Sequence, residues 1–283
     1  MQLRAPAKIN LSFRILGRRD DGFHEIETLM APVSLCDELT LAATDDAGVV
    51  HFSCDDPSLP TGDDNLAVRA ARLFFAATGI AGGVRIALRK RIPHGAGLGG
   101  GSSDAAAVLL GLHRMFGSGL ETAALAALGA EIGSDVPFFL YRSACVCRGR
   151  GELVEPAPLP DTLPLLLLKP AFGVATPWAY GRWKGSKELP GIRYDAQSFG
   201  GAEFVNDLER PVFEKYVFLA RLKMWLLAQP EVGAALLSGS GSTVLAVLRE
   251  NGSADDLTRR AEAELDRELW SCACETLSGD AVS

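Results

Sequence analysis

Alternating apolar and polar residues predict a series of short strands at the start of the chain. Residues 9–15 read I-N-L-S-F-R-I, the period of two that gives a strand one buried face. Residues 25–33, 38–41 and 49–54 have the composition of further short strands, with turn-forming residues between them. We therefore expect about the first sixty residues to be rich in β-structure.

Helical segments begin only after this region. Residues 63–65, D-D-N, supply N-cap candidates for a helix that ends at Gly79. An alternating strand at 84–92 leads into a glycine-dense loop, after which Ser102 opens a second helix, and a third is predicted over 121–132. Because the first strands follow one another without helices between them, we expect an α+β fold rather than a doubly wound sheet.

A proline-rich segment predicts a domain boundary. Four prolines lie within residues 156–164, a composition typical of a linker. We expect one domain over 1–158 and a second over 159–283. The elements predicted after the boundary are a strand at 165–168, helical segments within 207–229, a strand at 243–248 and an amphipathic helix over 255–269.

Charge and composition exclude several classes of protein. The 283 residues contain 28 Lys and Arg against 35 Asp and Glu, a net charge of −7, which provides no positive field for nucleic acid. The longest purely aliphatic run, 165–168, is far too short to cross a membrane, and the N-terminus lacks the pattern of a signal peptide. We expect a cytoplasmic protein with small-molecule partners, and the sequence leaves its oligomeric state open.

The six cysteines do not form a metal-binding pattern. Two pairs have C-x-C spacing rather than C-x-x-C, and no histidine lies beside either pair, so we expect reduced, buried thiols rather than a zinc site. They are Cys36, Cys54, Cys145, Cys147, Cys272 and Cys274.

The loop at residues 95–101, called here the first glycine loop, is the strongest candidate for chemistry. Five of its seven residues are glycine, and it lies between a predicted strand and a helix whose first N–H groups favour an anion such as phosphate. A P-loop is excluded because no lysine follows the glycines. The dinucleotide fingerprint is matched in letters, but no acidic residue follows a next strand. A glycine hinge without a ligand remains the structural alternative.

Residues 93–103, P-H-G-A-G-L-G-G-G-S-S, resemble the phosphate-binding motif of the GHMP kinases. Four more motifs occur in the order found in that family: A-K-I-N-L at 7–11, D-G-F-H at 21–24, G-S-D-V-P-F-F at 133–139 and N-D-L-E at 206–209. The resemblance implies a two-domain GHMP kinase fold with ATP bound in the first domain and the active site in the interdomain cleft. It assigns ATP binding to Pro93, His94, Gly95, Ala96, Gly97, Leu98, Gly99, Gly100, Gly101, Ser102 and Ser103.

The combination of motifs is similar to the branch of the family that acts on a cytidine-linked polyol. It implies ATP-dependent phosphorylation of the 2-hydroxyl of 4-diphosphocytidyl-2-C-methyl-D-erythritol in the non-mevalonate isoprenoid pathway. By resemblance, Asp135 accepts the proton of the hydroxyl, and Lys8 holds the reacting oxygen and the γ-phosphate while keeping that carboxylate ionised. From spacing alone, Lys8 would be an exposed strand residue and Asp135 a turn or capping aspartate.

The same resemblance places the substrate on Asn10, Phe23, His24 and Tyr180. Asn10 projects from the same strand face as Lys8 and offers a donor and an acceptor to hydroxyl groups. Phe23 stacks on the cytosine, although many family members have tyrosine at this position, His24 reads the base edge, and Tyr180 closes the other face.

Several assignments rest on the family alone or stay open. Ser102 or Ser103 is expected to ligate Mg²⁺, with a helix cap as the alternative. Residues 63–66 are expected near the adenine, and residues 238–243, called here the second glycine loop, resemble the third GHMP motif. The segment 178–197 and the tail after Leu248 match no motif. Two other functions stay open: another GHMP small-molecule kinase, such as a homoserine or mevalonate kinase, and a catalytically silent nucleotide-binding protein.

Overall fold

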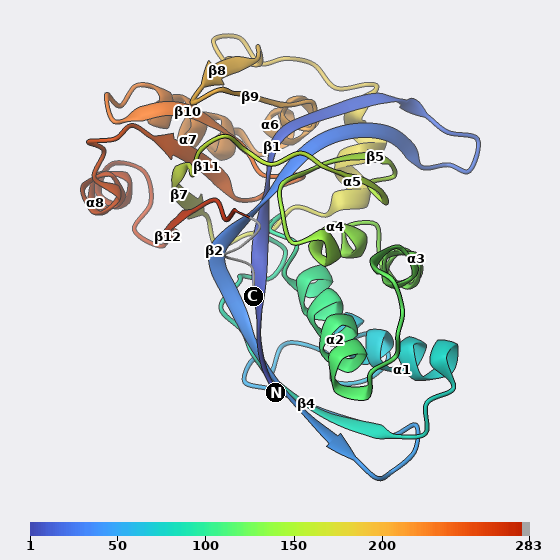
Figure 1. The fold of residues 1–283 in the computed structure, drawn as a ribbon. Coiled ribbons are helices and arrows are strands. Elements are labelled where there is room, and N and C mark those ends of the chain that lie inside the picture. The colour runs from blue at the N-terminus through green and yellow to red at the C-terminus, as the bar shows by residue number, and fades with distance from the viewer. Residues whose placement is uncertain (279–283) are drawn as a thin grey trace.

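A long antiparallel hairpin is the central feature of the computed structural model, which describes residues 1–278 (Figure 1). Its strands are β1 (Gln2–Arg18) and β2 (His24–Thr44). The expected separate strands at 25–33 and 38–41 are wrong, because β2 is continuous through both. The pairing of β1 with β2 contains irregularities, one of them between Pro6 and Lys8, where Lys8 lies opposite Pro32 of β2.

The hairpin lies within an eight-stranded sheet of order β3-β4-β2-β1-β9-β8, to which β5 and β6 are added beside β2. The other strands of this sheet are β3 (Val50–Cys54), β4 (Gly83–Arg89), β5 (Cys145–Gly149), β6 (Leu153–Pro156), β8 (Gln197–Phe199) and β9 (Ala202–Asn206). Since β8 and β9 come from the second half of the chain, the sheet joins segments on both sides of residue 158. The division into two domains there stays a prediction.

Four helices pack beside one side of the hairpin, namely α1 (Leu66–Thr78), α2 (Gly100–Phe116), α3 (Thr122–Ile132) and α4 (Val136–Tyr141). They bury Phe74, Leu109 and Phe138 against Leu41 and Ile86 of the sheet. The helix expected from residue 63 begins at Leu66, where the Asn65 side chain caps it by accepting a hydrogen bond from the Ala67 N–H at 2.9 Å.

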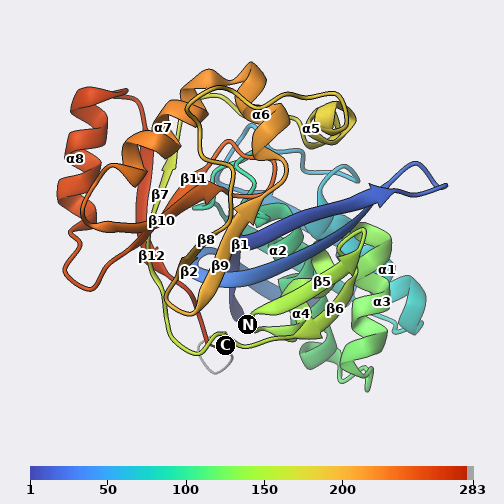
Figure 2. The ribbon, with the colours of Figure 1, turned by 90° about the horizontal axis from the view of Figure 1, so that it is seen from above.

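A second sheet lies on the other side of the hairpin, as both ribbon views show (Figures 1 and 2). Its strand order is β10 (Val232–Leu237), β11 (Val244–Leu248), β7 (Pro164–Lys169) and β12 (Trp270–Glu275). The helices of this half are α5 (Thr176–Trp183), α6 (Glu209–Lys215), α7 (Val217–Leu227) and α8 (Ala254–Glu264). The helix expected over 255–269 therefore ends five residues early, and strands β10 and β12 were not predicted.

An apolar cluster between the two sheets anchors the first glycine loop. Ile9 and Leu11 of β1 contribute to it together with Leu165 and Leu167 of β7, and Leu98 of the loop is buried in it with 1% of its surface exposed. The glycine loop is thus fixed to the core by the one large apolar side chain it contains. Among residues 1–278, no helix has the length and apolarity needed to span a membrane.

Candidate active site

The main cavity of the described chain has a volume of about 390 Å³ and is bounded by both halves. The first half contributes the first glycine loop and the start of α2, and the second contributes Thr176 and Tyr180 of α5 and Gly239 and Ser240 of the second glycine loop. Of the residues expected in the site, those lining the cavity are Lys8, Asn10, Pro93, His94, Gly95, Ala96, Gly97, Leu98, Gly99, Gly100, Gly101, Ser102, Asp135 and Tyr180.

The backbone of the first glycine loop needs glycine at specific positions. Gly97 and Gly99 both have left-handed φ angles, of 75° and 71°, which other residues adopt at a cost. A Cβ on Gly97 would collide with the carbonyl oxygen of Ser238, and one on Gly99 would lie 2.9 Å from Cγ of Lys8. The absent side chains therefore allow the loop to lie directly against the second glycine loop and the lysine.

Helix α2 begins at Gly100, within this loop and two residues before the expected start at Ser102, and no side chain caps its N-terminus. Its residue before the first turn is Gly99, and the free N–H groups of that turn lie at the cavity. The positive end of the helix dipole adds to them, so this end of the cavity favours a phosphate group.

Lys8 and Asp135 converge in the cavity from different elements. Lys8 lies in β1, where its N–H donates to the carbonyl oxygen of Leu98 in the loop at 2.9 Å, and its side chain is 6% exposed. Asp135 directly precedes α4 but makes no capping hydrogen bond. Its Oδ2 lies 3.6 Å from Lys8 Nζ, and its side chain is 36% exposed. The carboxylate thus remains available to a bound molecule.

Asn10 extends the ion pair into a buried chain of hydrogen bonds. Lys8 Nζ donates to Asn10 Oδ1 at 2.9 Å, which confirms that both side chains lie on one face of β1. Asn10 Nδ2 donates to Thr28 Oγ1 at 2.8 Å, and that hydroxyl donates to the carbonyl oxygen of Ser12 at 2.6 Å. Asn10 keeps one N–H and one oxygen lone pair for a ligand.

The two serines at the start of α2 face different ways. Ser102 lines the main cavity, whereas Ser103 is 1% exposed and borders a separate small cavity beside Arg114 and Arg142. Within residues 1–278, the Ser103 hydroxyl has no hydrogen-bond partner. Ser102 is therefore the serine placed to meet a ligand of the first glycine loop.

Tyr180, which lines the cavity, packs against His24, which does not line it. Their rings are stacked, with centroids 5.1 Å apart, and Trp183 meets His24 edge-on at 6.0 Å. Burial and the nearby Arg18 lower the pKa of His24, so the imidazole is neutral at pH 7. Burial and the Asp135 carboxylate raise the pKa of Tyr180, which keeps its phenol protonated.

Phe23 lies apart from this stack, at the end of the hairpin. It is 52% exposed, and the guanidinium carbon of Arg150 lies 4.8 Å from its ring centroid. Arg150 lines the cavity, whereas Phe23 itself does not, so the structure connects Phe23 to the cavity only by this contact.

Sequence reasoning missed Arg150 and a buried charge cluster formed by Asp37, Lys90 and Asp104. Lys90 Nζ donates to carboxylates of both aspartates, at 2.9 Å for Asp104, and both Lys90 and Asp104 line the cavity. Burial, with a contribution from Asp37, raises the pKa of Asp104 to about 7. A basic residue between two glycines, R-G-R-G at 148–151, was the only local signal for Arg150.

The second glycine loop closes the cavity against both the first glycine loop and Lys8. The Ser238 hydroxyl donates to the carbonyl oxygen of Gly97 at 3.2 Å, and the Thr243 N–H donates to that of Ala96 at 3.3 Å. Ser240 and Thr176 share a hydrogen bond of 2.7 Å, which ties the loop to α5. Of the residues expected near the adenine, Asp64, Asn65 and Leu66 line the cavity, and Asp63 does not.

The described residues contain no group of three or more His, Cys, Asp or Glu side chains that could hold a metal ion. A cation in this cavity would therefore depend largely on oxygens of a bound ligand, as Mg²⁺ does in many phosphate sites.

Comparisons with known proteins agree with this geometry. The model of the family described as "GHMP kinases N terminal domain" matches residues 65–143. A 4-diphosphocytidyl-2-C-methyl-D-erythritol kinase from Methylacidiphilum infernorum (isolate V4) is 44% identical over 273 residues, covering 94% of this chain and 93% of that protein.

Solved structures give the same result for the fold. A crystal structure of 4-(cytidine 5'-diphospho)-2C-methyl-D-erythritol kinase is 37% identical, with a TM-score of 0.78 and coverage of 98% of this chain and 100% of that chain. The homoserine kinase of Cytophaga hutchinsonii superposes with a TM-score of 0.73 at 19% identity, covering 98% and 94% of the two chains. At that identity the second match bears on the fold alone.

Proposed function

The chain belongs to the 4-diphosphocytidyl-2-C-methyl-D-erythritol kinase family, and we propose that it transfers the γ-phosphoryl group of ATP to the 2-hydroxyl of that substrate. The reaction is a step of non-mevalonate isoprenoid synthesis. The observation that carries the proposal is the Lys8–Asp135 pair, 3.6 Å apart in a cavity that begins at the glycine-bounded N-terminus of α2.

The triphosphate of ATP lies on the first glycine loop in this proposal. The first-turn N–H groups of α2 and its dipole stabilise the phosphate charge without a side-chain cap competing for them. Asn65 and Leu66, which open α1 at the edge of the cavity, border the adenine.

Asp135 accepts the proton of the acceptor hydroxyl. As the hydroxyl oxygen forms its bond to the γ-phosphorus, the bond from that phosphorus to the β,γ-bridging oxygen breaks, ADP leaves, and the proton passes to the carboxylate. Lys8 Nζ, held 2.9 Å from Asn10 Oδ1, places its charge beside the reacting oxygens and stabilises the negative charge of the transition state.

The Ser102 hydroxyl fits Mg²⁺ coordination better than that of Ser103, because only Ser102 lines the cavity. The Ser102 hydroxyl would help to hold Mg²⁺, and the ion would supply positive charge that offsets the charge of the transferred group. Ser103 is buried away from this cavity, with 1% of its surface exposed.

The cytidine end of the substrate is recognised by His24, Tyr180 and Phe23. A neutral imidazole has one donor and one acceptor, which suits the edge of cytosine. Tyr180 and Phe23 supply aromatic faces for the base, and Arg150, which lies over Phe23, supplies positive charge for the diphosphate.

A panel of acceptors tests the proposal. The purified chain is incubated with ATP, Mg²⁺ and, separately, 4-diphosphocytidyl-2-C-methyl-D-erythritol, homoserine or mevalonate, and ³¹P NMR follows ADP and the new phosphomonoester. We expect turnover with the cytidine-linked acceptor alone, and phosphorus coupling that locates the ester at C2. Turnover confined to homoserine or mevalonate, or ATP consumption with none of the three, would contradict it.

A further inference from the structure

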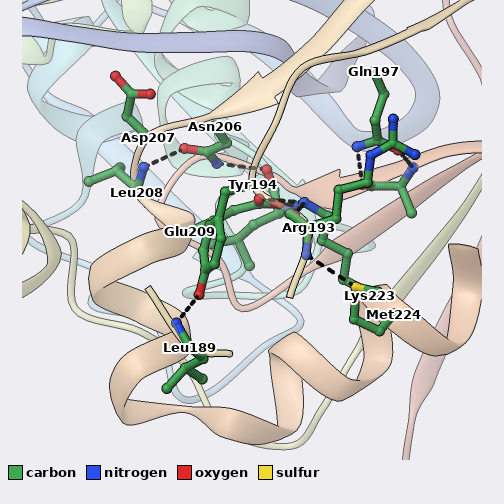
Figure 3. A network of polar contacts seen from close by, with 12 residues as sticks. Leu189, Arg193, Tyr194, Gln197, Asn206, Asp207, Leu208, Glu209, Lys223 and Met224 are labelled. Atoms are coloured by element: carbon green, nitrogen blue, oxygen red, sulfur yellow. Dashed lines mark hydrogen bonds and ion pairs between the residues drawn. The ribbon is translucent and has the colours of Figure 1, made fainter. Parts of the chain in front are cut away.

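The N-D-L-E motif at residues 206–209 has no role assigned in the reaction described above, although its first and last side chains, Asn206 and Glu209, belong to a buried polar network (Figure 3). We propose that Asn206 and Glu209 are positioning residues that hold the second glycine loop in place against Lys8. The proposal rests on the function proposed above for Lys8.

Asn206 attaches the second glycine loop to strand β9. Its Nδ2 donates to the carbonyl oxygens of Leu237, the last residue of β10, at 2.8 Å and of Gly239 in the loop at 2.7 Å. Its Oδ1 accepts from the N–H of Leu208 at 2.9 Å, which fixes the orientation of the carboxamide. The side chain is buried, so no water competes for these bonds.

Glu209 binds the backbone of Leu237 as well, through the N–H rather than the carbonyl oxygen. Its Oε1 accepts from the N–H of Leu237 at 2.9 Å, and its Oε2 pairs with Lys223 Nζ of α7 at 2.6 Å. Lys223 also donates to the carbonyl oxygen of Arg193 at 2.6 Å. Leu237 is therefore fixed at both its N–H and its carbonyl oxygen by the two ends of one motif.

The backbone held in this way reaches the catalytic lysine within two residues. A Cβ built on Gly239 would lie 3.5 Å from Lys8 Nζ and 3.3 Å from Asn10 Oδ1, so the loop backbone closes over both groups. The loop also supports Gly97 through the Ser238 hydroxyl at 3.2 Å. A shift of the loop would loosen Lys8 and the first glycine loop together.

A role in positioning accounts for a fully buried ion pair at this place. Glu209 and Lys223 are each 1% exposed, and a buried pair contributes little net stability compared with apolar side chains of similar volume. An apolar side chain in place of Glu209 would have no oxygen to accept the hydrogen bond from the Leu237 N–H.

The test compares variants that keep or lose these hydrogen bonds. Asn206→Asp keeps the side-chain volume but replaces the Nδ2 donor by a second oxygen facing two carbonyl groups. The double variants Glu209→Gln/Lys223→Met and Glu209→Met/Lys223→Met both remove the buried charges, and only the first keeps an acceptor for Leu237. Asp207→Asn is the control, because its side chain accepts from the N–H of Ile15, away from the loop, and the amide keeps an acceptor.

We expect kcat to fall about 10- to 100-fold in Asn206→Asp and in the Met/Met double variant, as small displacements of reacting groups do. KM for either substrate should change less than about threefold, since the binding surfaces remain. The control and the Gln/Met variant should stay within about twofold of wild type in kcat. All are compared at equal folded fraction, by circular dichroism, well below their melting temperatures.

Hydrogen exchange separates this proposal from the proposed function. The N–H groups of Gly241 and Thr243 are bonded to Ser238 and Ala96, and they should exchange faster in the two impaired variants even if the wild type phosphorylated no acceptor tested. Wild-type kcat and unchanged exchange in Asn206→Asp would overturn the proposal. So would equal losses of kcat in the two double variants, which decide the question if Asn206→Asp fails to fold.

Discussion

The orientation of single residues in this site is determined by contacts with residues far away in the sequence. Thr28 orients Asn10 across 18 positions, and Leu98 receives a hydrogen bond from the backbone of Lys8. The motif letters predicted Lys8, Asn10 and Asp135, which the structure brings together. They could not predict Thr28 or Arg150, because those residues enter the site through strand register and a hairpin turn.

Phe23 should contribute to acceptor binding and not to ATP binding. Removing its ring in Phe23→Ala should raise KM for the cytidine-linked substrate about 5- to 100-fold, the effect of losing one base-stacking contact. KM for ATP should not change, because the first glycine loop lies elsewhere. Steady-state kinetics with Leu16→Ala as the control, another exposed apolar residue of the hairpin, checks this. Equal effects of the two variants would contradict the stacking role.

Asp104 should make the stability of the fold depend on pH. Burial raises its pKa from an ordinary 3.8 to about 7, so between these values the folded state binds a proton that the unfolded state has lost. Its contribution to stability is full at low pH and is lost as pH rises to about 7. The asparagine of an Asp104→Asn variant does not titrate, so the variant avoids this loss of stability. The melting temperature of the variant minus that of the wild type should therefore increase by several degrees from pH 5 to pH 8.

The control for this measurement is Asp256→Asn, which removes a half-exposed carboxylate on α8. Its melting temperature should follow wild type across the same range. Parallel pH profiles for wild type and Asp104→Asn would show that Asp104 titrates at an ordinary pKa.

At the scale of elements, the two glycine loops behave as one structure. Gly95 and Gly97 both have left-handed φ angles, but only a Cβ on Gly97 would meet the second loop, whereas nothing lies within 4 Å of one on Gly95. Gly95→Ala should therefore lower kcat/KM for ATP less than about tenfold, from backbone strain of roughly 1 kcal/mol. Gly97→Ala should lower it more than about a hundredfold, and equal losses would contradict a requirement for contact between the loops.

The elements that sequence reasoning missed are those without a one-sided pattern. Strand β10 reads V-G-A-A-L-L and is buried almost throughout, so apolar and polar positions do not alternate. Residues 266–268, D-R-E, continue the alternation of acidic and basic residues after Glu264 and so suggested a longer helix. Helix α8 nevertheless ends at Glu264, and β12 begins at Trp270. By contrast, β1 alternates between buried and partly exposed positions from Leu11 to Ile15, and α1 has a side-chain cap at Asn65, so both were predicted.

At the scale of the whole molecule, the cavity gathers charged groups of both signs within an acidic protein. The net charge is −7, and Lys8, Lys90 and Arg150 line the cavity together with Asp64, Asp104, Asp135 and the N-terminus of α2. The three cations and the helix start come from β1, the end of β4, the β5–β6 turn and α2, so only the complete fold brings them together. The proposed catalytic pair depends on the same convergence, since Lys8 and Asp135 are 127 positions apart.

The rate of phosphoryl transfer in Asp135→Asn tests the central claim most directly. With ATP and 4-diphosphocytidyl-2-C-methyl-D-erythritol both saturating, rapid-quench single turnovers measure the chemical step in the wild type, in Asp135→Asn and in the Asp207→Asn control. We expect a rate about 10²- to 10⁴-fold below wild type for Asp135→Asn alone, the contribution of a general base, with substrate affinities within a few-fold. A folded Asp135→Asn variant that transfers phosphate within about threefold of the wild-type rate would contradict it.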